Sequence, residues 1–285
     1  MPELPEVETI RRGLRTTLLK TAGKVRKITV FEGKSFIGEP KTLLGTELSG
    51  IRRRGKAMIL DFQNGKSVII HLRMTGQLIW VPEGGERFAG GHPNENFLSE
   101  LPNKQTRVEI EFENGKLFFN DQRKFGFLKV VPTEEVEEDS FIKKLAKEPW
   151  EMTGKELYEK LQRHKLAPIK TIILDQTIIC GLGNIYADEA LFYAGIKPTR
   201  KAGEVSGKEA EKLVEGARTV MERSLDAGGS TIRNYVKSDG TKGDYLELFA
   251  KVFNREGKEC KRCGEKIKKI RVGGRGTHFC ENCQI

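Results

Sequence analysis

The first residues of the chain place a candidate nucleophile beside two carboxyl groups. If Met1 is removed, as is common before a small second residue, Pro2 carries a free secondary amine. An α-amino group titrates near pH ~8, well below a lysine at ~10.4, so much of it is neutral at working pH. A neutral amine can attack an aldehyde-level carbon and form an iminium ion. Glu3 and Glu6 lie within one helical turn of this amine.

Two alternatives stay open for this segment. Acidic residues are common at helix starts, so Glu3 and Glu6 could simply cap a helix. If Met1 is retained, the Pro2 nitrogen is an amide and cannot act as a nucleophile.

Four of the five cysteines form two Cys-x-x-Cys pairs, Cys260/Cys263 and Cys280/Cys283, with sixteen residues between them. Each pair can offer two thiolates from one tight turn, and two such turns complete a tetrahedron. We therefore predict one structural Zn²⁺ in a closed site without Lewis-acid chemistry, with a redox pair as the alternative. Cys180 stands alone.

The segment between the cysteine pairs alternates charged and apolar residues from Lys266 to Arg275 and contains Gly273-Gly274. This pattern predicts a hairpin with charges on one face and a sharp turn at the glycines. Such a hairpin can present arginine to phosphate, although a zinc ribbon used for protein contacts fits the same pattern.

The N-terminal half must position the Pro2 amine. Apolar residues at helical spacing predict a helix over Pro5–Lys20, so Pro2 and Glu3 lie just outside its start. From Val25 to Val131 the pattern is that of strands, with hairpins at Asn64-Gly65 and Asn114-Gly115. Several such strands indicate a β-sandwich or barrel.

The C-terminal half changes to a helical period after an acidic stretch, Glu134–Asp139, which we interpret as a connector. We expect helices over Gly154–Arg163, over Ile185–Ala194 ending at Gly195, and from Ser206 to about Ala227. The expected domains are residues 1–132 (β-sandwich with the Pro2 amine), 133–153 (linker), 154–250 (helical) and 251–285 (zinc-finger hairpin).

The charge of the chain suits a polyanionic partner. Fifty Lys and Arg against forty Asp and Glu give a net charge of +10, and residues 251–285 hold ten basic residues against four Glu, a net charge of +6. No apolar run approaches the ~20 residues of a membrane helix, and the first residues do not resemble a secretion signal. These observations predict a cytoplasmic protein that binds nucleic acid and no membrane.

Motifs along the whole chain resemble bacterial formamidopyrimidine-DNA glycosylases. They are Met1-Pro-Glu-Leu-Pro-Glu-Val-Glu-Thr9, Arg52-Arg-Arg-Gly-Lys56, His71-Leu-Arg-Met-Thr-Gly76, Asp121-Gln-Arg-Lys-Phe-Gly126, Gly181-Leu-Gly-Asn-Ile-Tyr-Ala-Asp-Glu189 and Gly273-Gly-Arg-Gly-Thr-His-Phe-Cys280. The related endonuclease VIII branch typically begins Pro-Glu-Gly-Pro-Glu, so Leu4 favours the oxidised-purine branch.

The resemblance implies an α+β multidomain fold. It has an N-terminal β-sandwich with flanking helices and a C-terminal helical domain with a helix-two-turn-helix and a four-cysteine zinc finger. The implied function is a monomeric, bifunctional glycosylase and AP lyase that excises 8-oxoguanine and formamidopyrimidines from damaged duplex DNA in base excision repair. The implied location is the bacterial cytoplasm, associated with the nucleoid, and the one cofactor is the structural Zn²⁺.

The resemblance also assigns catalytic roles residue by residue. Pro2 attacks C1′ of the damaged nucleotide, expels the base and becomes a Schiff base, Glu3 is the general acid that helps open the sugar ring, and Glu6 orients the start of the chain. Lys56 acts near the β-elimination and contacts phosphate. Arg275 assists the δ-elimination and holds the phosphate beside the lesion.

Further positions match DNA contacts of the family. His71, Lys170 and Asn184 match phosphate contacts, and Lys165 matches a further DNA contact. Gln105 stands where many relatives carry a DNA-contacting histidine. Met74, Arg123 and Phe125 match the residues that fill the gap left by the extruded base. A lesion-closing loop contains Thr231, Ile232, Arg233, Asn234 and Tyr235. Without the resemblance, Met74 and Phe125 are more often core residues than a wedge. His71 is then compatible with a core histidine, Lys56 with a solvated strand edge and Asn184 with a helix cap.

Two rival functions remain compatible with this pattern. An enzyme of the same fold could prefer oxidised pyrimidines, against which Leu4 and the Arg123-Lys-Phe125 triplet argue. A non-catalytic lesion-binding protein would keep the zinc finger but would not need Pro2, Glu3 and Lys56 together.

Overall fold

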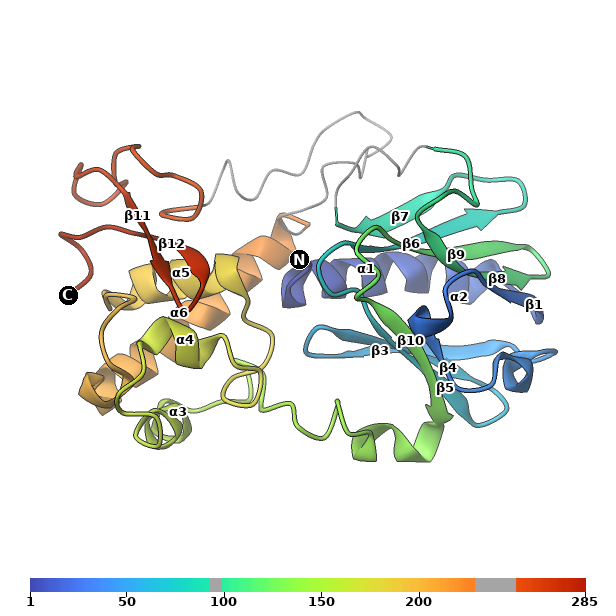
Figure 1. Ribbon diagram of the computed structural model, residues 1–285, viewed down its shortest axis with the longest axis horizontal. Coiled ribbons are helices and arrows are strands. Elements are labelled where there is room, and N and C mark those ends of the chain that lie inside the picture. Colours follow the sequence, from blue (N-terminus) through green and yellow to red (C-terminus); the bar gives the residue numbers. More distant parts are fainter. Residues whose placement is uncertain (93–98, 229–249) are drawn as a thin grey trace. The chain divides into compact units, whose positions relative to one another are not determined.

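The computed structural model describes residues 1–92, 99–228 and 250–285. These residues form two compact units. The first, residues 1–143, is called here the sandwich unit, and the second, residues 144–227 with 250–285, the finger unit (Figure 1). The lesion-closing loop expected at residues 231–235 lies outside the described residues.

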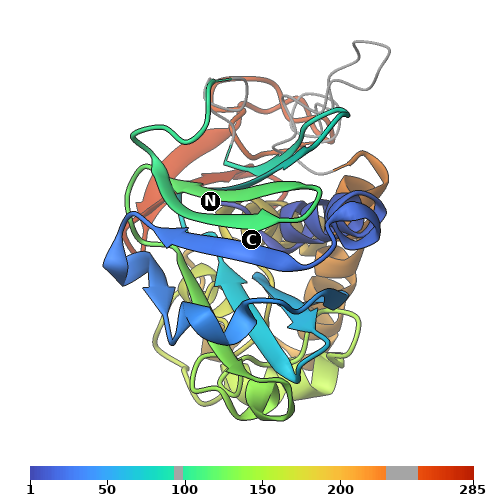
Figure 2. The ribbon, with the colours of Figure 1, turned by 90° about the vertical axis from the view of Figure 1, so that its right-hand side faces the viewer.

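The sandwich unit contains two five-stranded sheets, as the sequence predicted. The first has the order β1 (Val25–Val30), β8 (Thr106–Phe112), β9 (Gly115–Asp121), β6 (Gly76–Pro82) and β7 (Phe88–Gly91), and the second the order β2 (Phe36–Ile37), β10 (Phe127–Pro132), β5 (Lys66–His71), β4 (Ala57–Phe62) and β3 (Leu48–Arg54). Neighbours pair antiparallel except β2 and β10, which are parallel. Figure 2 shows the two sheets as separate layers.

Both predicted hairpins are present. Asn64-Gly65 connects β4 to β5, where Asp61 pairs with Ser67, and Asn114-Gly115 connects β8 to β9, where Phe112 pairs with Gly115. Apolar side chains of both sheets meet in one core together with those of the N-terminal helices. The alternation that the sequence shows therefore marks the inner faces of a sandwich.

The predicted single helix over Pro5–Lys20 is wrong in its second half. Helix α1 spans Leu4–Thr16 and a separate short helix, α2, spans Leu18–Thr21. Thr17 leaves the helical conformation, with φ −109° and ψ −85°. The hydroxyls of Thr16 and Thr17 both donate to the Gly13 carbonyl, at 2.9 and 2.8 Å, and such side-chain bonds compete with the helical ladder.

Helix α1 packs closely on β7, an edge strand of the first sheet. A Cβ built on Gly13 would lie 2.1 Å from the Phe88 ring, and one built on Gly90 would lie 2.5 Å from Ile10. Residues Val7, Ile10 and Leu14 enter the core between the sheets. This packing fixes the start of α1, and with it Pro2 and Glu3, on a rigid sheet.

The finger unit contains the three predicted helices, the first of which ends at Leu161 rather than Arg163, one helix that was not predicted, and the predicted hairpin. Its elements are α3 (Gly154–Leu161), α4 (Ile169–Ile173), α5 (Asn184–Ala194), α6 (Gly207–Asp226), β11 (Lys268–Val272) and β12 (Arg275–Phe279). Ser206 and Glu209 form the predicted capping box of α6, and Gly195 ends α5 with φ +75°. Helix α5 is buried on almost every side, from Ile185 to Phe192.

Short 3-10 helices complete the described elements: η1 (Gly33–Ser35), η2 (Pro40–Leu43), η4 (Thr133–Glu138) and η5 (Ala202–Glu204). Helix η4 covers most of the acidic stretch that we interpreted as a connector. This stretch is packed rather than extended, because Val136 is buried and Asp139 forms an ion pair with Lys129 of β10.

Among the helices of the described residues, none has the length and apolar character that a membrane crossing requires.

Candidate active site and metal centre

The residues around Pro2 form a buried corner at the start of α1. Pro2 is buried, and Glu3 and Glu6 are each only 2 % exposed. Glu6 Oε2 accepts the Glu3 backbone N–H at 2.8 Å, so the Glu6 side chain reaches back over the first turn of the helix. This bond fixes the direction in which the chain enters the helix and is part of a capping box, the alternative that the sequence left open for Glu3 and Glu6.

The amino group of Met1, the residue that precedes Pro2, lies in the electrostatic neighbourhood of His92 and Asp121. Burial lowers the pKa of His92, the positive charge of the N-terminus lowers it further, and Asp121 opposes both effects. His92 directly follows β7, and its carbonyl accepts a hydrogen bond from the Gln77 side chain at 2.6 Å. The amine is therefore placed near the ends of β7 and β9.

Lys56 and His71 come together on neighbouring strands of the second sheet. Ala57, the residue after Lys56, pairs with His71. Lys56 and His71 are each 6 % exposed. Burial and the charges of Arg73 and Lys56 lower the pKa of His71 to about 3. His71 Nδ1 accepts the Arg73 backbone N–H at 2.9 Å, so the neutral ring carries its proton on Nε2. His71 can therefore donate a hydrogen bond to phosphate without carrying a charge.

Asp121 organises the two loops that carry Met74, Arg123 and Phe125. Its carboxylate is fully buried and accepts hydrogen bonds from the Thr75 hydroxyl and from the backbone N–H groups of Arg123, Phe125 and Gly126. The bond to Thr75 joins the loop of Met74 to the loop of Arg123 and Phe125. The sequence motif contained Asp121, but our interpretation of the sequence gave it no role.

Phe125 is the exposed tip of this second loop. It is 54 % exposed, which is high for a large apolar side chain, and the Arg123 guanidinium lies 4.9 Å from its ring centroid. Met74 is half-buried. The three side chains thus belong to loops that one carboxylate ties together, and Phe125 is not part of the core. Gln105 is also half-buried, and its backbone carbonyl accepts the Asp121 backbone N–H at 2.9 Å.

The four paired cysteines converge as a metal site requires. Their sulfur atoms all lie within 4.8 Å of one another, with Cys260 and Cys283 at 3.9 Å and Cys263 and Cys280 at 3.5 Å. Sulfurs bound to one zinc at ~2.3 Å stand ~3.8 Å apart, whereas a disulfide needs about 2 Å. The four cysteines therefore fit one structural Zn²⁺, as predicted, and their geometry does not fit a disulfide.

The hairpin between the cysteine pairs ends in the predicted turn at Gly273-Gly274. Both glycines have positive φ, +54° and +76°, as a two-residue type I′ turn requires. Val272 pairs with Arg275, so Arg275 is the first residue after the turn, and its side chain is exposed. The turn presents this arginine at the tip of the hairpin.

Lys170 and Asn184 hold the same tip from the helices. The Lys170 ammonium donates to the Gly276 carbonyl at 3.1 Å and to the Thr277 hydroxyl at 2.8 Å, and the Asn184 amide donates to the Gly276 carbonyl at 2.9 Å. Lys170 also forms an ion pair with Asp188 at 2.7 Å, with both side chains 0 % exposed. The phosphate contact that the resemblance implied for Lys170 stays a prediction, and in this structure its ammonium is enclosed by these partners.

The structure thus brings Lys170, Asn184 and Arg275 together in the finger unit. Lys165 lies apart from them on the exposed turn after α3. Sequence reasoning missed Asp188 and Glu189, two adjacent acidic residues that are buried in the otherwise apolar helix α5. Their position was the available signal, because a buried carboxylate must have a partner inside the protein.

Comparisons with known proteins agree along the whole chain. Family models match residues 1–128 (formamidopyrimidine-DNA glycosylase N-terminal domain), residues 145–236 (formamidopyrimidine-DNA glycosylase H2TH domain) and residues 257–285 (zinc finger found in FPG and IleRS). The proteins named formamidopyrimidine-DNA glycosylase from Desulfitobacterium hafniense and Pelotomaculum thermopropionicum are 38 % and 39 % identical, over 100 % of this chain and 100 % and 99 % of theirs.

Solved structures are similar over the same length. A complex of Lactococcus lactis Fpg with DNA that contains an abasic site is 32 % identical over 99 % of both chains, with a TM-score of 0.85. A complex of the wild-type Lactococcus lactis protein with DNA that contains an oxidized pyrimidine is also 32 % identical over 99 % of both chains, with a TM-score of 0.84.

The depressed pKa of His71 predicts a pH-dependent stability. Because the folded pKa of about 3 lies below the ordinary 6.5, His71 contributes stability that is complete above pH 6.5 and is lost as the pH falls towards 3. From pH 7 to pH 5 this loss is about 2 kcal/mol. We expect the unfolding free energy of His71→Gln, measured with urea, to fall by about 2 kcal/mol less between pH 7 and pH 5 than that of the unmodified protein. His164→Gln changes an exposed histidine and should show the same fall as the unmodified protein. Equal losses in all three proteins would contradict the assignment.

The buried pair of Lys170 and Asp188 predicts a non-additive effect on stability. Lys170→Met leaves the Asp188 carboxylate without its cation and should cost about 3–5 kcal/mol of unfolding free energy. Adding Asp188→Asn removes the uncompensated charge and should recover part of that loss. Lys147→Met, which removes the cation of an exposed pair with Glu156, should cost less than about 1 kcal/mol. Denaturant unfolding of the four proteins tests this, and a Lys170→Met loss no larger than that of Lys147→Met would refute it.

The cysteine geometry predicts one zinc per chain. Elemental analysis should find one equivalent, and a strong chelator should release it and weaken DNA binding, because a segment as small as residues 251–285 depends on its metal for folding. Cys263→Ser should lower the zinc content, whereas Cys180→Ala, outside the cluster, should retain one equivalent. Full zinc content in Cys263→Ser would rule out the four-cysteine site.

Proposed function

Because the chain belongs to the formamidopyrimidine-DNA glycosylase family, we propose that it excises oxidised purines from duplex DNA and then cleaves the strand as an AP lyase. The proposed substrates are 8-oxoguanine and formamidopyrimidines, and the protein acts as a single chain. The observation that carries the proposal is the buried corner of Pro2, Glu3 and Glu6 at the start of α1.

The proposed reaction uses the Pro2 amine after removal of Met1. The neutral nitrogen attacks C1′ of the damaged nucleotide and a C1′–N bond forms, while the base leaves with the electron pair of its bond to C1′ and takes up the proton that the nitrogen loses. Glu3 protonates the ring oxygen as the sugar opens, which leaves an iminium between Pro2 and C1′. The position of Glu3, directly after Pro2 in the chain and only 2 % exposed, supports this role.

The strand is then cut by elimination on both sides of the opened sugar. Loss of a proton from C2′ expels the 3′ phosphate, and a second elimination expels the 5′ phosphate, so a one-nucleotide gap remains. Lys56 is proposed to act near the first elimination and Arg275 to assist the second. The exposed position of Arg275 beside a rigid turn suits a phosphate contact.

Access to C1′ requires that the damaged base leave the helix, at a cost of a few kcal/mol. We assign Met74 and Phe125 to the vacated space, where apolar side chains offset the lost stacking. The exposure of Phe125 supports this assignment. Arg123, stacked on Phe125, is proposed to hydrogen-bond the unpaired partner base.

Oxidised pyrimidines are a second substrate class to consider. The Lactococcus lactis relative has been solved with DNA that contains an oxidized pyrimidine. A panel of duplexes with different lesions therefore belongs to the first experiment.

Borohydride trapping tests the proposal. The purified protein is mixed with a duplex that carries one 8-oxoguanine opposite cytosine, the mixture is reduced, and the covalent adduct is mapped. We expect an adduct through the N-terminal residue of protein that begins at Pro2, and an at least tenfold slower reaction in Pro2→Gly. Loss of the general acid in Glu3→Gln should slow opening of the sugar ring, and with it formation of the trapped adduct, about 10²-fold or more.

Glu83→Gln is the matched control, because it neutralises an exposed carboxylate after β6. It should react like the unmodified protein. DNA binding without any adduct, in protein shown by sequencing to start at Pro2, would favour the non-catalytic lesion-binding protein. Faster excision of an oxidised pyrimidine than of 8-oxoguanine would refute the proposed substrate preference.

A further inference from the structure

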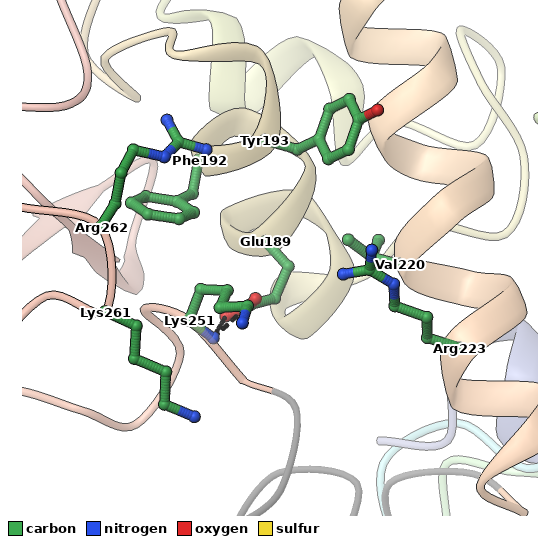
Figure 3. Close-up of a pocket in the computed structure, with 8 residues that line it drawn as sticks. All are labelled: Glu189, Phe192, Tyr193, Val220, Arg223, Lys251, Lys261 and Arg262. Atoms are coloured by element: carbon green, nitrogen blue, oxygen red, sulfur yellow. Dashed lines mark hydrogen bonds between the residues drawn. The ribbon is translucent and has the colours of Figure 1, made fainter.

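A pocket of about 340 Å³ lies in the finger unit, and none of its lining residues has been assigned to catalysis, DNA contact or zinc binding. Figure 3 shows that it opens between α5, α6 and the segment around the first Cys-x-x-Cys turn. The lining residues are Glu189, Phe192, Tyr193, Val220, Arg223, Lys251, Lys261 and Arg262. We call this pocket the basic pocket.

The charges around the basic pocket are unbalanced. Four of its eight lining residues are cationic and one, Glu189, is acidic. The Glu189 carboxylate is already engaged, because it accepts the backbone N–H groups of Lys251, Val252 and Phe253 at 2.9, 2.9 and 2.8 Å. Its position therefore reflects a structural task, namely holding the chain at Lys251 against α5.

Three of these four cations have no carboxylate of the described residues as an ion-pair partner. Within residues 1–92, 99–228 and 250–285, no Asp or Glu forms an ion pair with the side chain of Arg223, Lys251 or Arg262. The Arg262 guanidinium lies over the Phe192 ring, 4.3 Å from its centroid. Stacking of this kind holds the guanidinium plane in place and leaves its N–H edge for a ligand.

Grouping several cations in a concave site is unfavourable unless an anion enters it, because the low-dielectric walls concentrate their field. Lysine and arginine together are the usual protein partners of phosphate. The volume lies within the range of ~300–1,000 Å³ that is typical of small-ligand sites, so it accommodates a phosphate with an attached sugar. We propose that the basic pocket is a second phosphate-binding site, for a phosphate group carried by the DNA backbone or by a free nucleotide.

The test compares two double variants with the same change in charge. Arg223→Gln/Lys251→Gln removes two pocket cations, and the backbone bonds of Lys251 to Glu189 do not depend on its side chain. Lys208→Gln/Lys212→Gln removes two exposed cations near the start of α6, ~16 Å or more along the helix from Arg223. Zinc content and melting temperature are measured for both, so that a damaged finger is recognised.

Each zinc-loaded protein is titrated with deoxyguanosine monophosphate and inorganic phosphate by calorimetry, and with undamaged duplex DNA at several salt concentrations. If the ligand is a free nucleotide, the pocket variant loses at least about tenfold in affinity for the monophosphate and binds duplex like the control variant. If the phosphate belongs to the DNA backbone, the pocket variant loses at least about tenfold in affinity for duplex DNA. The magnitude of the slope of log K against log salt is then smaller by about one to two than in the control variant.

Either result supports the second phosphate site and identifies the source of the phosphate. Equal binding of all three ligands by the pocket variant and the control variant would overturn it. These measurements do not involve the Pro2 adduct, so failure of the proposed catalytic function and failure of this site are distinguishable.

Discussion

Asp188 lies in the middle of an apolar helix, and its fully buried carboxylate depends on partners inside the protein. This carboxylate forms an ion pair with the Lys170 ammonium and accepts a hydrogen bond from the His278 backbone N–H at 2.8 Å. Lys170 in turn reaches Gly276 and Thr277. The ion pair therefore joins α4, α5 and β12, and the position of the hairpin tip with Arg275 depends on it. Such a pair adds little net stability, but breaking it is costly, which makes alternative arrangements of the hairpin unfavourable.

Three other buried carboxylates of the described residues also hold segments that lack regular structure. Asp121 accepts three backbone N–H groups of the loop that carries Arg123 and Phe125, and Glu189 accepts three at the start of the final segment. Glu6 accepts one at the entry to α1. Each carboxylate satisfies donors that a loop would otherwise leave to water. Loops held in this way keep a fixed geometry before any ligand arrives, which is a condition for efficient binding and catalysis.

The proposed chemistry divides between a neutral and a charged environment. Around Pro2 and His71 the side chains are buried, and the low pKa of His71 keeps its ring uncharged. In the finger unit, by contrast, exposed and partly exposed cations gather at the hairpin tip and in the basic pocket. A nucleophilic amine works in its neutral form, whereas phosphate recognition needs positive charge. The two tasks therefore call for different surroundings, and the chain provides both.

The sequence by itself determined the features that depend on neighbouring residues. The cysteine spacing defined the metal site, Asn-Gly and Gly-Gly pairs defined the turns, and apolar periodicity located the sheets and helices. It did not reveal the break at Thr17, where hydroxyl groups compete with a helix that the periodicity favours. Nor did it reveal that Lys170 is enclosed, or that Asp188 and Glu189 are structural. Lys170 and Asp188 are 18 residues apart, and their further hydrogen-bond partners and those of Glu189 lie 62 to 107 residues away. Only the tertiary fold decides which distant groups share a buried volume.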